Sequence, residues 1–298
     1  MEVKGNENNY GDYITYSAKL EGYKWYKPIL AMLLTGLFAF IFINIIVVIV
    51  VIIVINDGMQ VAEIMGMIRG GYDGFNTYTA WGAIYSCGTL ASILPAMMIA
   101  GKILKWRPMS TYSSSRGGWD MKLFLKCLGI SIVVVGIPIA VISYLTLEKT
   151  SGIRFSPAGL ILCTILTPLQ CIAEEFLFRG ILLQTLGGWI KKVLPAMIIS
   201  AFFFMLCHPY SIAGRVEIMI AGVLLTVMVC LTNGLEASSA SHVVNNTVLF
   251  YMSGLGFDTV HTEVAWVDVI HVIIIDGVYV LILYILTKKT DWFRAKNK

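Results

Sequence analysis

The sequence predicts an all-α, polytopic membrane protein, a bundle of about eight transmembrane helices. Of its 298 residues, 57% are hydrophobic and 13% are charged, and the mean hydropathy is +0.78. Apolar runs recur along the chain, and a helix of about 20 apolar residues crosses a hydrocarbon core of roughly 30 Å. Only helices and closed barrels satisfy their backbone hydrogen bonds in lipid, and these continuous runs lack the alternation of barrel strands. The fold should therefore be a helical bundle.

Each predicted helix is an apolar run bounded by charged residues, Gly or Pro. The first run would reach about 40 Å at 1.5 Å per residue, so it should tilt or project from the bilayer. In order, the runs are 29–55, 80–104, 123–147, 157–186, 193–209, 216–232, 236–254 and 265–287. They leave an N-terminal segment at 1–28, a C-terminal tail at 288–298 and no separate soluble domain. The polar stretch Pro108–Asp120 should be a flexible connection.

The distribution of Lys and Arg predicts the orientation in the membrane. Eight spans would place both termini on one side, and sixteen of the 22 basic residues fall on that side. The opposite loops hold four, which are Arg69, Lys149, Arg154 and Arg215. The positive-inside rule then predicts a multi-pass cell-membrane protein with both termini in the cytoplasm. No basic tract suggests nucleic acid as a partner, and no feature of the sequence indicates an oligomeric state.

Ionisable residues inside the apolar runs are few, and each needs a partner or a function. An ionisable side chain at mid-membrane costs at least about 2.5 kcal/mol on insertion scales. Glu174, Glu175 and Arg179 lie in the fourth run, Phe204 and His208 in FMLCHP, and His242, Asn245 and Asn246 in SHVVNN. Asp276 lies in the last run. It should either form a structural pair with Lys126, the spare cation within a span, or line the wall of a water-filled cavity.

Helical geometry separates the two adjacent glutamates. Residues four apart meet on a helix surface, so Arg179 should neutralise Glu175. Glu174 points elsewhere, without a cation on its own helix. The same spacing places His242 and Asn246 on one face and turns Asn245 away.

A glutamate, two histidines and an asparagine on three helices are the parts needed for water-dependent acyl hydrolysis. A carboxylate with an imidazole can deprotonate water, while neutral donors stabilise the developing oxyanion. No serine or cysteine has a base at helical spacing, so a protein nucleophile is not indicated. A proton relay in a transporter would use similar residues, but the broken helices and paired repeats typical of transporters are not evident.

At these residues the sequence resembles the CAAX protease and bacteriocin-processing family of intramembrane proteases, also described as the Abi family. The family pattern is two adjacent glutamates with an arginine four beyond the second, a phenylalanine four before a histidine, and a histidine four before an asparagine. Glu174, Glu175 and Arg179, then Phe204 and His208, then His242 and Asn246 complete it in order. The resemblance covers about residues 157–254.

The resemblance implies a glutamic-type, metal-independent endopeptidase with a site that opens to the cytoplasm. Glu174 and His208 would activate water, His242 and Asn246 would hold the oxyanion, and Glu175, Arg179 and Phe204 would support them. The implied substrate is a membrane-associated, lipidated or leader-bearing peptide or protein. Zinc at Glu174, His208 and His242 is an alternative to the cofactor-free site. A bacteriocin self-immunity protein that acts by binding is the alternative function.

Overall fold

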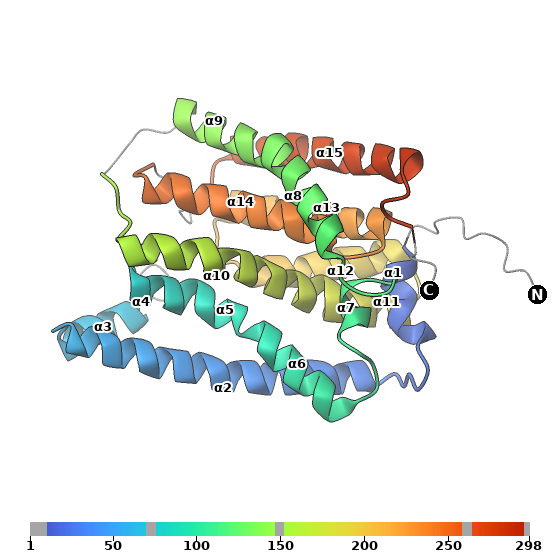
Figure 1. Ribbon diagram of the computed structural model, residues 1–298, viewed down its shortest axis with the longest axis horizontal. Helices are drawn as coiled ribbons and strands as arrows, with labels where there is room; N and C mark the ends of the chain where they lie inside the picture. Colours follow the sequence, from blue (N-terminus) through green and yellow to red (C-terminus); the bar gives the residue numbers. More distant parts are fainter. Residues whose placement is uncertain (1–10, 70–75, 147–151, 258–263, 295–298) are drawn as a thin grey trace, which may run out of the picture.

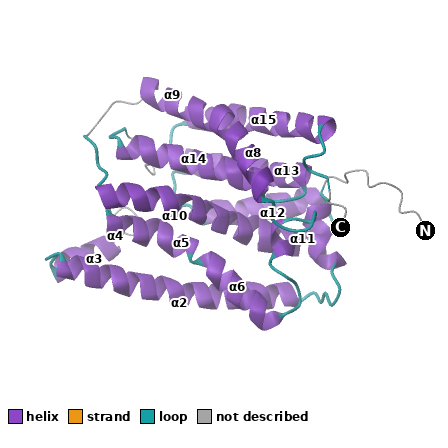
Figure 2. Cartoon of the chain, viewed as in Figure 1, coloured by secondary structure: helices purple, strands orange, loops and turns teal. Residues whose placement is uncertain are grey.

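A bundle of helices lying side by side forms the protein (Figure 1). The computed structural model describes residues 11–69, 76–146, 152–257 and 264–294. These residues contain helices, turns and loops but no strand (Figure 2), which confirms the all-α prediction. Lys149, the first ten residues of the N-terminal segment and the last four of the C-terminal tail lie outside the described residues.

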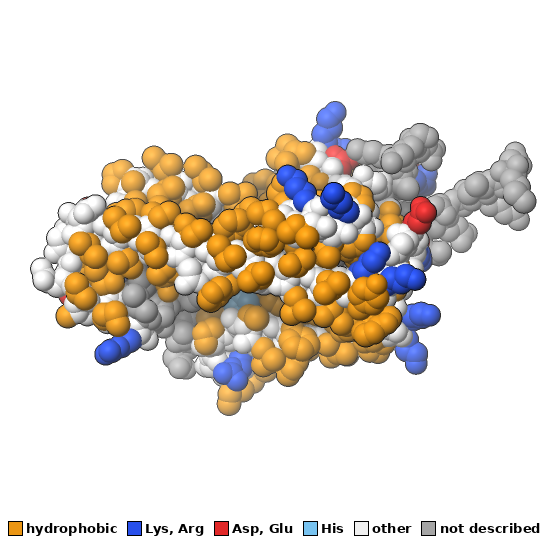
Figure 3. Space-filling view, turned by 90° about the horizontal axis from the view of Figure 1, so that it is seen from below, with side chains coloured by type: hydrophobic (Ala, Val, Ile, Leu, Met, Phe, Trp, Pro, Cys, Tyr) orange, Lys and Arg blue, Asp and Glu red, His pale blue; other side chains and the backbone are white. Residues whose placement is uncertain are grey.

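Six helices of the described chain are long and apolar enough to cross a membrane. Three of them run through a wider π-helical segment, η3, η4 or η5. The six are α2 (Lys27–Asn56); α4 (Ala80–Ala83), η3 (Ile84–Gly88), α5 (Thr89–Ala91) and α6 (Ile93–Leu104); α8 (Met121–Ser131), η4 (Ile132–Gly136) and α9 (Ile137–Thr146); α10 (Pro157–Glu175), η5 (Phe176–Leu183) and α11 (Gln184–Ile190); α13 (Ile212–Thr232); and α15 (Trp266–Lys289). Apolar side chains cover much of the surface that they present (Figure 3).

The remaining two predicted spans are helices of a different kind, so the count of eight is not confirmed. Helix α12 (Val193–Leu206) has 14 residues, which at 1.5 Å per residue reach only about 21 Å. Helix α14 (Glu236–Gly254) has 19 residues but a polar sequence, and every residue from Glu236 to Val244 is buried. α14 is therefore an interior helix enclosed by other helices. For this reason hydropathy alone does not show whether it is a membrane span.

The two largest apolar clusters of the described chain lie on either side of the contact between α10 and α14. One joins α8, α13, α14 and α15 around Met228 and Tyr279. The other joins α2, α6 and α10 around Met97 and Ala173. In hydrocarbon such contacts rest on close packing rather than on the exclusion of water. The interface of α10 with α14 is the place where polar side chains are enclosed.

The two ends of the described chain pack at the same end of the bundle, where α2 begins (Figure 1). The short helix α1 (Asp12–Thr15) and the 3₁₀-helix η1 (Tyr16–Lys19) precede α2, and α3 (Val61–Arg69) follows it at the opposite end. Tyr13 and Ile14 are fully buried, and the Gly11 backbone N–H donates to the Cys230 carbonyl over 3.2 Å. Phe293, after α15, is buried in the same apolar cluster as Leu123 of α8. The two ends of the described chain thus lie at one end of the bundle.

The stretch Pro108–Asp120 is packed rather than a flexible connection, so that prediction is wrong. It contains α7 (Ser110–Ser113), and Thr111, Tyr112, Ser113 and Ser114 are buried. The backbone of this stretch forms hydrogen bonds with the turn between α13 and α14. The Ser115 N–H donates to the Asn233 carbonyl (3.1 Å), and the Leu235 N–H donates to the Ser113 carbonyl (2.8 Å). A polar sequence is compatible with burial when its hydrogen bonds are made within the protein.

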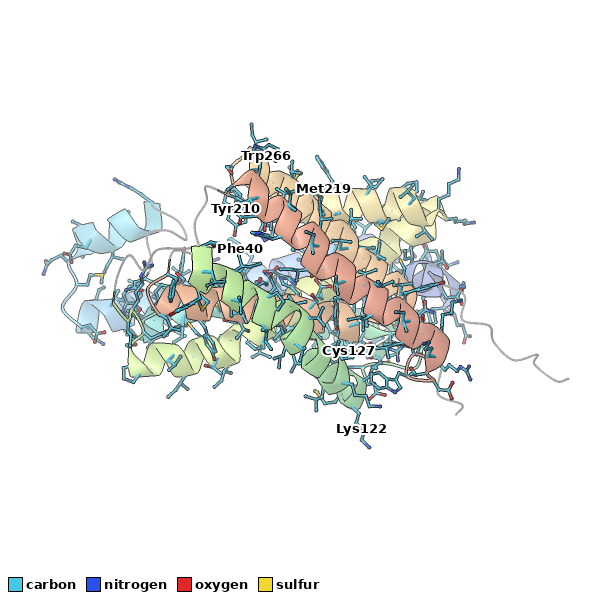
Figure 4. All side chains as sticks on the ribbon, turned by 90° about the horizontal axis from the view of Figure 1, so that it is seen from above. Phe40, Lys122, Cys127, Tyr210, Met219 and Trp266 are labelled. Carbon is cyan, nitrogen blue, oxygen red and sulfur yellow. The ribbon has the colours of Figure 1, made fainter. Side chains whose placement is uncertain are left out.

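Polar caps fix where the helices begin. Ser156 precedes Pro157 and accepts the Gly159 N–H over 3.0 Å at the start of α10, an N-cap followed by proline. Asp120 caps α8 in the same way. Ser211 caps α13 and also accepts the Val264 N–H over 3.2 Å, which ties the entry of α15 to α13. In Figure 4, Tyr210 and Trp266 lie together on the side of the bundle opposite Lys122.

Candidate active site

The candidate site begins where α10 changes into the π-helical turn η5. Glu174 and Glu175 are the last two residues of α10, and Arg179 lies in η5. π-helical turns are rare and frequently occur at functional sites. Glu174 is 6% exposed and Glu175 is fully buried. Both carboxylates are therefore enclosed by protein at the interface with α14.

Glu175 and Arg179 form the buried ion pair that the sequence predicts. Arg179 Nη1 lies 2.9 Å from Glu175 Oε1. The second Arg179 nitrogen, Nη2, donates to the Gly222 carbonyl of α13 over 3.3 Å, and the guanidinium stacks on the Phe204 ring at 4.4 Å. This ion pair links α10, η5, α12 and α13.

Glu174 has no cation on its helix, but it has a hydrogen-bond donor that the sequence reading missed. Gln170 Nε2 donates to Glu174 Oε1 over 3.1 Å. The spacing of four residues along α10 was the available signal. The other oxygen, Oε2, lies 3.6 Å from His242 Nε2 on α14. One oxygen of Glu174 is thus held by the amide, and the other faces the histidine.

His242 lies between the two glutamates. Its Nδ1 is 3.1 Å from Glu175 Oε1, and its Nε2 is 3.6 Å from Glu174 Oε2. The Glu175 carboxylate, which pairs with an arginine, accepts hydrogen bonds and cannot donate them. His242 Nδ1 therefore carries the proton in its contact with Glu175. Nε2 is then the nitrogen that faces Glu174.

Asn246 lies on the same face of α14 as His242, as predicted. Its Nδ2 is 3.4 Å from His242 Nε2. Asn245 was expected to face away, yet its amide donates to Asn246 Oδ1 over 3.0 Å, because a flexible amide reaches around the helix to its neighbour. Asn245 therefore orients Asn246.

His208 joins the site through Phe204. It follows α12, which ends at Leu206 shortly before Pro209. Its Nδ1 is 2.8 Å from the Phe204 carbonyl, an atom that only accepts, so Nδ1 carries the proton and Nε2 keeps a lone pair. The Phe204 ring lies 4.7 Å from the His208 ring and 6.0 Å from that of His242. Glu174 and His208, both described, make no hydrogen bond or ion pair with each other.

The three residues of the zinc alternative, Glu174, His208 and His242, are not gathered into one ligand set. Within the ranges that the structure describes, no three His, Cys, Asp or Glu side chains are placed to share a metal ion. His242 directs one nitrogen to each glutamate instead.

Two other polar residues within the predicted spans have partners that differ from the prediction. Asp276 of α15 accepts a hydrogen bond from Ser241 over 3.2 Å. Lys126 lies over the Trp292 ring at 4.3 Å, so it is not the counter-ion of Asp276. A buried ion pair that the sequence reading missed joins Arg116 to Glu236 at 2.6 Å. Its partners lie 120 residues apart, so no helical spacing signals it.

Comparison with known proteins bears on residues 156–248. This segment matches the family model described as "Type II CAAX prenyl endopeptidase Rce1-like". It contains all seven residues of the pattern, from Glu174 to Asn246. Comparisons with curated proteins and with solved structures gave no significant match.

Proposed function

Because residues 156–248 belong to the type II CAAX prenyl endopeptidase Rce1-like family, we propose that this membrane protein is an intramembrane endopeptidase. Its substrate would be a membrane-associated, lipidated or leader-bearing peptide or protein. The observation that carries the proposal is the position of His242, with Nδ1 3.1 Å from Glu175 and Nε2 3.6 Å from Glu174. An imidazole beside a carboxylate that lacks a cation of its own is the arrangement a water-activating site needs.

In the proposed mechanism Glu174 is the general base. Gln170 fixes one carboxylate oxygen, which leaves Oε2 to accept a proton from a water molecule that attacks the scissile carbonyl. His208 assists, since its Nδ1–H is bonded to the Phe204 carbonyl and its Nε2 is available to exchange a proton with water or the leaving amine. A positioned acid or base of this kind contributes about 10²–10⁴-fold to a rate.

His242 and Asn246 are proposed to hold the oxyanion of the tetrahedral intermediate. The amide Nδ2 of Asn246 and Nε2 of His242 lie 3.4 Å apart, so both can approach one oxygen. With Nδ1–H bonded to Glu175, His242 donates from Nε2 when the ring carries its second proton. Glu175, Arg179 and Phe204 would keep the imidazole in this orientation.

We propose that the reaction uses no metal ion and that the site opens on the side of the termini, in the cytoplasm. Support for the first statement comes from the donor sets, since both nitrogens of His242 face glutamates. Support for the second comes from the excess of Lys and Arg on that side. His242 lies six residues into α14. The turn before α14 packs on α1, where the Tyr13 N–H donates to Asn233 Oδ1 over 3.3 Å.

An assay of purified protein tests the proposal. Wild-type protein and the variants Glu174→Ala, His208→Ala and His242→Ala are compared in cleavage of synthetic precursor peptides, with and without a C-terminal lipid, after each variant is shown to be folded. Cleavage by the wild type and its loss in folded variants is the expected result. If the variants retain full biological activity in cells, peptidase action is refuted and immunity by binding becomes the better account.

A further inference from the structure

A cleft outside the candidate active site lies where α6 ends, beside the start of α2. It has a volume of about 360 Å³ and is lined by Gly101, Lys105, Trp106, Arg107 and Pro108. The cleft is open to the surface rather than enclosed. None of these five described residues is Asp or Glu, and two of them are basic.

Arg107 is a buried cation that pairs with no carboxylate in the part of the chain that the structure describes. It is 6% exposed, and among the described residues its hydrogen bonds go to neutral oxygens: Nε to Thr111 Oγ1 and Nη2 to Gln184 Oε1, both over 2.8 Å. The guanidinium also lies over the Tyr112 ring at 3.7 Å and the Trp106 ring at 5.3 Å. Burial lowers the pKa of Arg107 from its ordinary value. A buried charge is costly unless an opposite charge accompanies it.

The geometry leaves donors of Arg107 for such an anion. A guanidinium has five N–H groups in a planar fork, and the two hydrogen bonds use one on Nε and one on Nη2. These bonds also fix the plane of the fork, since Thr111 and Gln184 are themselves buried. A preorganised fork of this kind matches phosphate geometry, whereas lysine acts as a point charge.

Lys105 adds an exposed cation at a position where lysine is conformationally unfavourable. It caps α6 in the left-handed region, with φ 52° and ψ 19°. Glycine or asparagine usually occupies this position, because a side chain with a Cβ is strained there. Lys27 supplies a further cation nearby, with Nζ 6.0 Å from the centre of the Trp106 ring.

The location of the cleft indicates the kind of anion. α2 begins at Lys27 and α6 ends at Leu104, so the cleft lies at the membrane boundary. Trp25, 65% exposed, and Tyr26, 44% exposed, directly precede α2 in the manner of interfacial aromatic residues. Lys and Arg side chains gather at this end of the molecule (Figure 3). Phospholipid headgroups occupy the same level of a bilayer.

We infer that this cleft binds a phosphate-bearing anion between Arg107 and Lys105, supplied either by an anionic lipid headgroup or by free phosphate. The inference concerns binding and does not depend on the proposed peptidase activity. Arg107 also contacts Gln184, the first residue of α11 after η5, so a bound anion would brace the helix that carries Arg179.

Two lysines with the same backbone geometry provide a matched test. Lys191 caps α11 with φ 56° and ψ 20°, is exposed like Lys105 and does not line the cleft. Lys105→Asn and Lys191→Asn each remove one positive charge and place a residue that tolerates the left-handed region. Arg107→Gln removes the fork; should that variant fail to fold, the two lysine variants decide the question.

The experiment measures thermal stabilisation of the full chain in a maltoside detergent, with a short-chain phosphatidylglycerol, a short-chain phosphatidylcholine or inorganic phosphate as the added probe. Phosphatidylglycerol should raise the melting temperature of the wild type and of Lys191→Asn equally. The apparent Kd for phosphatidylglycerol should be about fivefold higher in Lys105→Asn, because each basic residue near an anionic lipid contributes about 1 kcal/mol.

The arms of the experiment identify the source of the phosphate. Stabilisation by phosphatidylglycerol that inorganic phosphate neither reproduces nor displaces assigns the cleft to a lipid headgroup. Stabilisation by inorganic phosphate that is lost in Lys105→Asn assigns it to free phosphate. Equal losses in Lys105→Asn and Lys191→Asn, unchanged binding in Lys105→Asn, or no stabilisation by any probe would overturn the inference.

Discussion

His242 Nδ1 lies 3.1 Å from Glu175 Oε1, so the glutamate that pairs with Arg179 also orients the histidine that faces Glu174. This contact links Glu175, which is proposed to support the site, to the histidine that faces Glu174, the proposed general base. Glu175 is fully buried and bound on one oxygen by an arginine and a histidine. Glu174 keeps one oxygen directed at the imidazole. The site can therefore be tested one carboxylate at a time.

Replacing Glu175 should damage the fold more than the chemistry. Glu175→Gln leaves the buried guanidinium of Arg179 without its counter-charge, and breaking a buried pair typically costs about 3–5 kcal/mol. Equilibrium unfolding in detergent should show a loss of that size. The double variant Glu175→Gln/Arg179→Met, which removes both charges, should lose less than the sum of the single variants. Additive losses would show that the two side chains are not energetically coupled.

Phe204 should contribute to stability through its contacts with Arg179 and His208. The Phe204 ring is 3% exposed and lies under the Arg179 guanidinium. Phe204→Leu should lower the free energy of unfolding by about 1–2 kcal/mol, the scale of a desolvated cation–π contact. Its neighbour Phe203 is 46% exposed, so Phe203→Leu is the matched control and should change little. Equal effects of the two substitutions would contradict the assigned packing.

Gly187 should be required for the N-terminal segment to dock. A Cβ at Gly187 would overlap the Ile14 side chain and carbonyl, and overpacking of this kind costs about 1–3 kcal/mol. Gly187→Ala should lower thermal stability and expose residues around Ile14 to limited proteolysis. Gly129 in α8 has no atom within 4 Å of such a Cβ, so Gly129→Ala should be neutral or stabilising. Protection of Ile14 in Gly187→Ala would refute the docking.

Cleavage should be insensitive to metal removal. His242 directs its nitrogens to the two glutamates, and no trio of ligands is gathered within the described ranges. Cleavage rates measured before and after dialysis against a chelator should therefore agree. Loss of activity on dialysis that zinc restores would overturn the metal-free mechanism and favour zinc at Glu174, His208 and His242.

The sequence predicts the contacts that lie within one helix. The spacing of four residues gives the pair of Glu175 with Arg179 and the shared face of His242 and Asn246, and both are present. The bond from Gln170 to Glu174 has the same spacing. These contacts follow from helix geometry alone.

Contacts between helices could not be predicted in the same way, because they depend on the packing angle and rotation of each helix. The contact of His242 with Glu175 spans 67 residues. The pairing of Asp276 with Lys126, one of its two interpretations, rested on charge alone, whereas the rotation of α15 directs Asp276 to Ser241. The polar composition of Pro108–Asp120 suggested exposure, although the α13–α14 turn satisfies its backbone. Hydropathy likewise fails for α14, which other helices enclose.

The rate of peptide cleavage by Glu174→Gln tests the central claim most directly. The substituted amide can still accept the Gln170 hydrogen bond, so the unfolding free energy should change by less than about 1 kcal/mol, while loss of the base should reduce cleavage by about 10²–10⁴-fold. Glu217→Gln, which changes another glutamate, on α13, is the control and should cleave at the wild-type rate. Wild-type cleavage by folded Glu174→Gln, or an equal loss in Glu217→Gln, would contradict the assignment of Glu174 as the base.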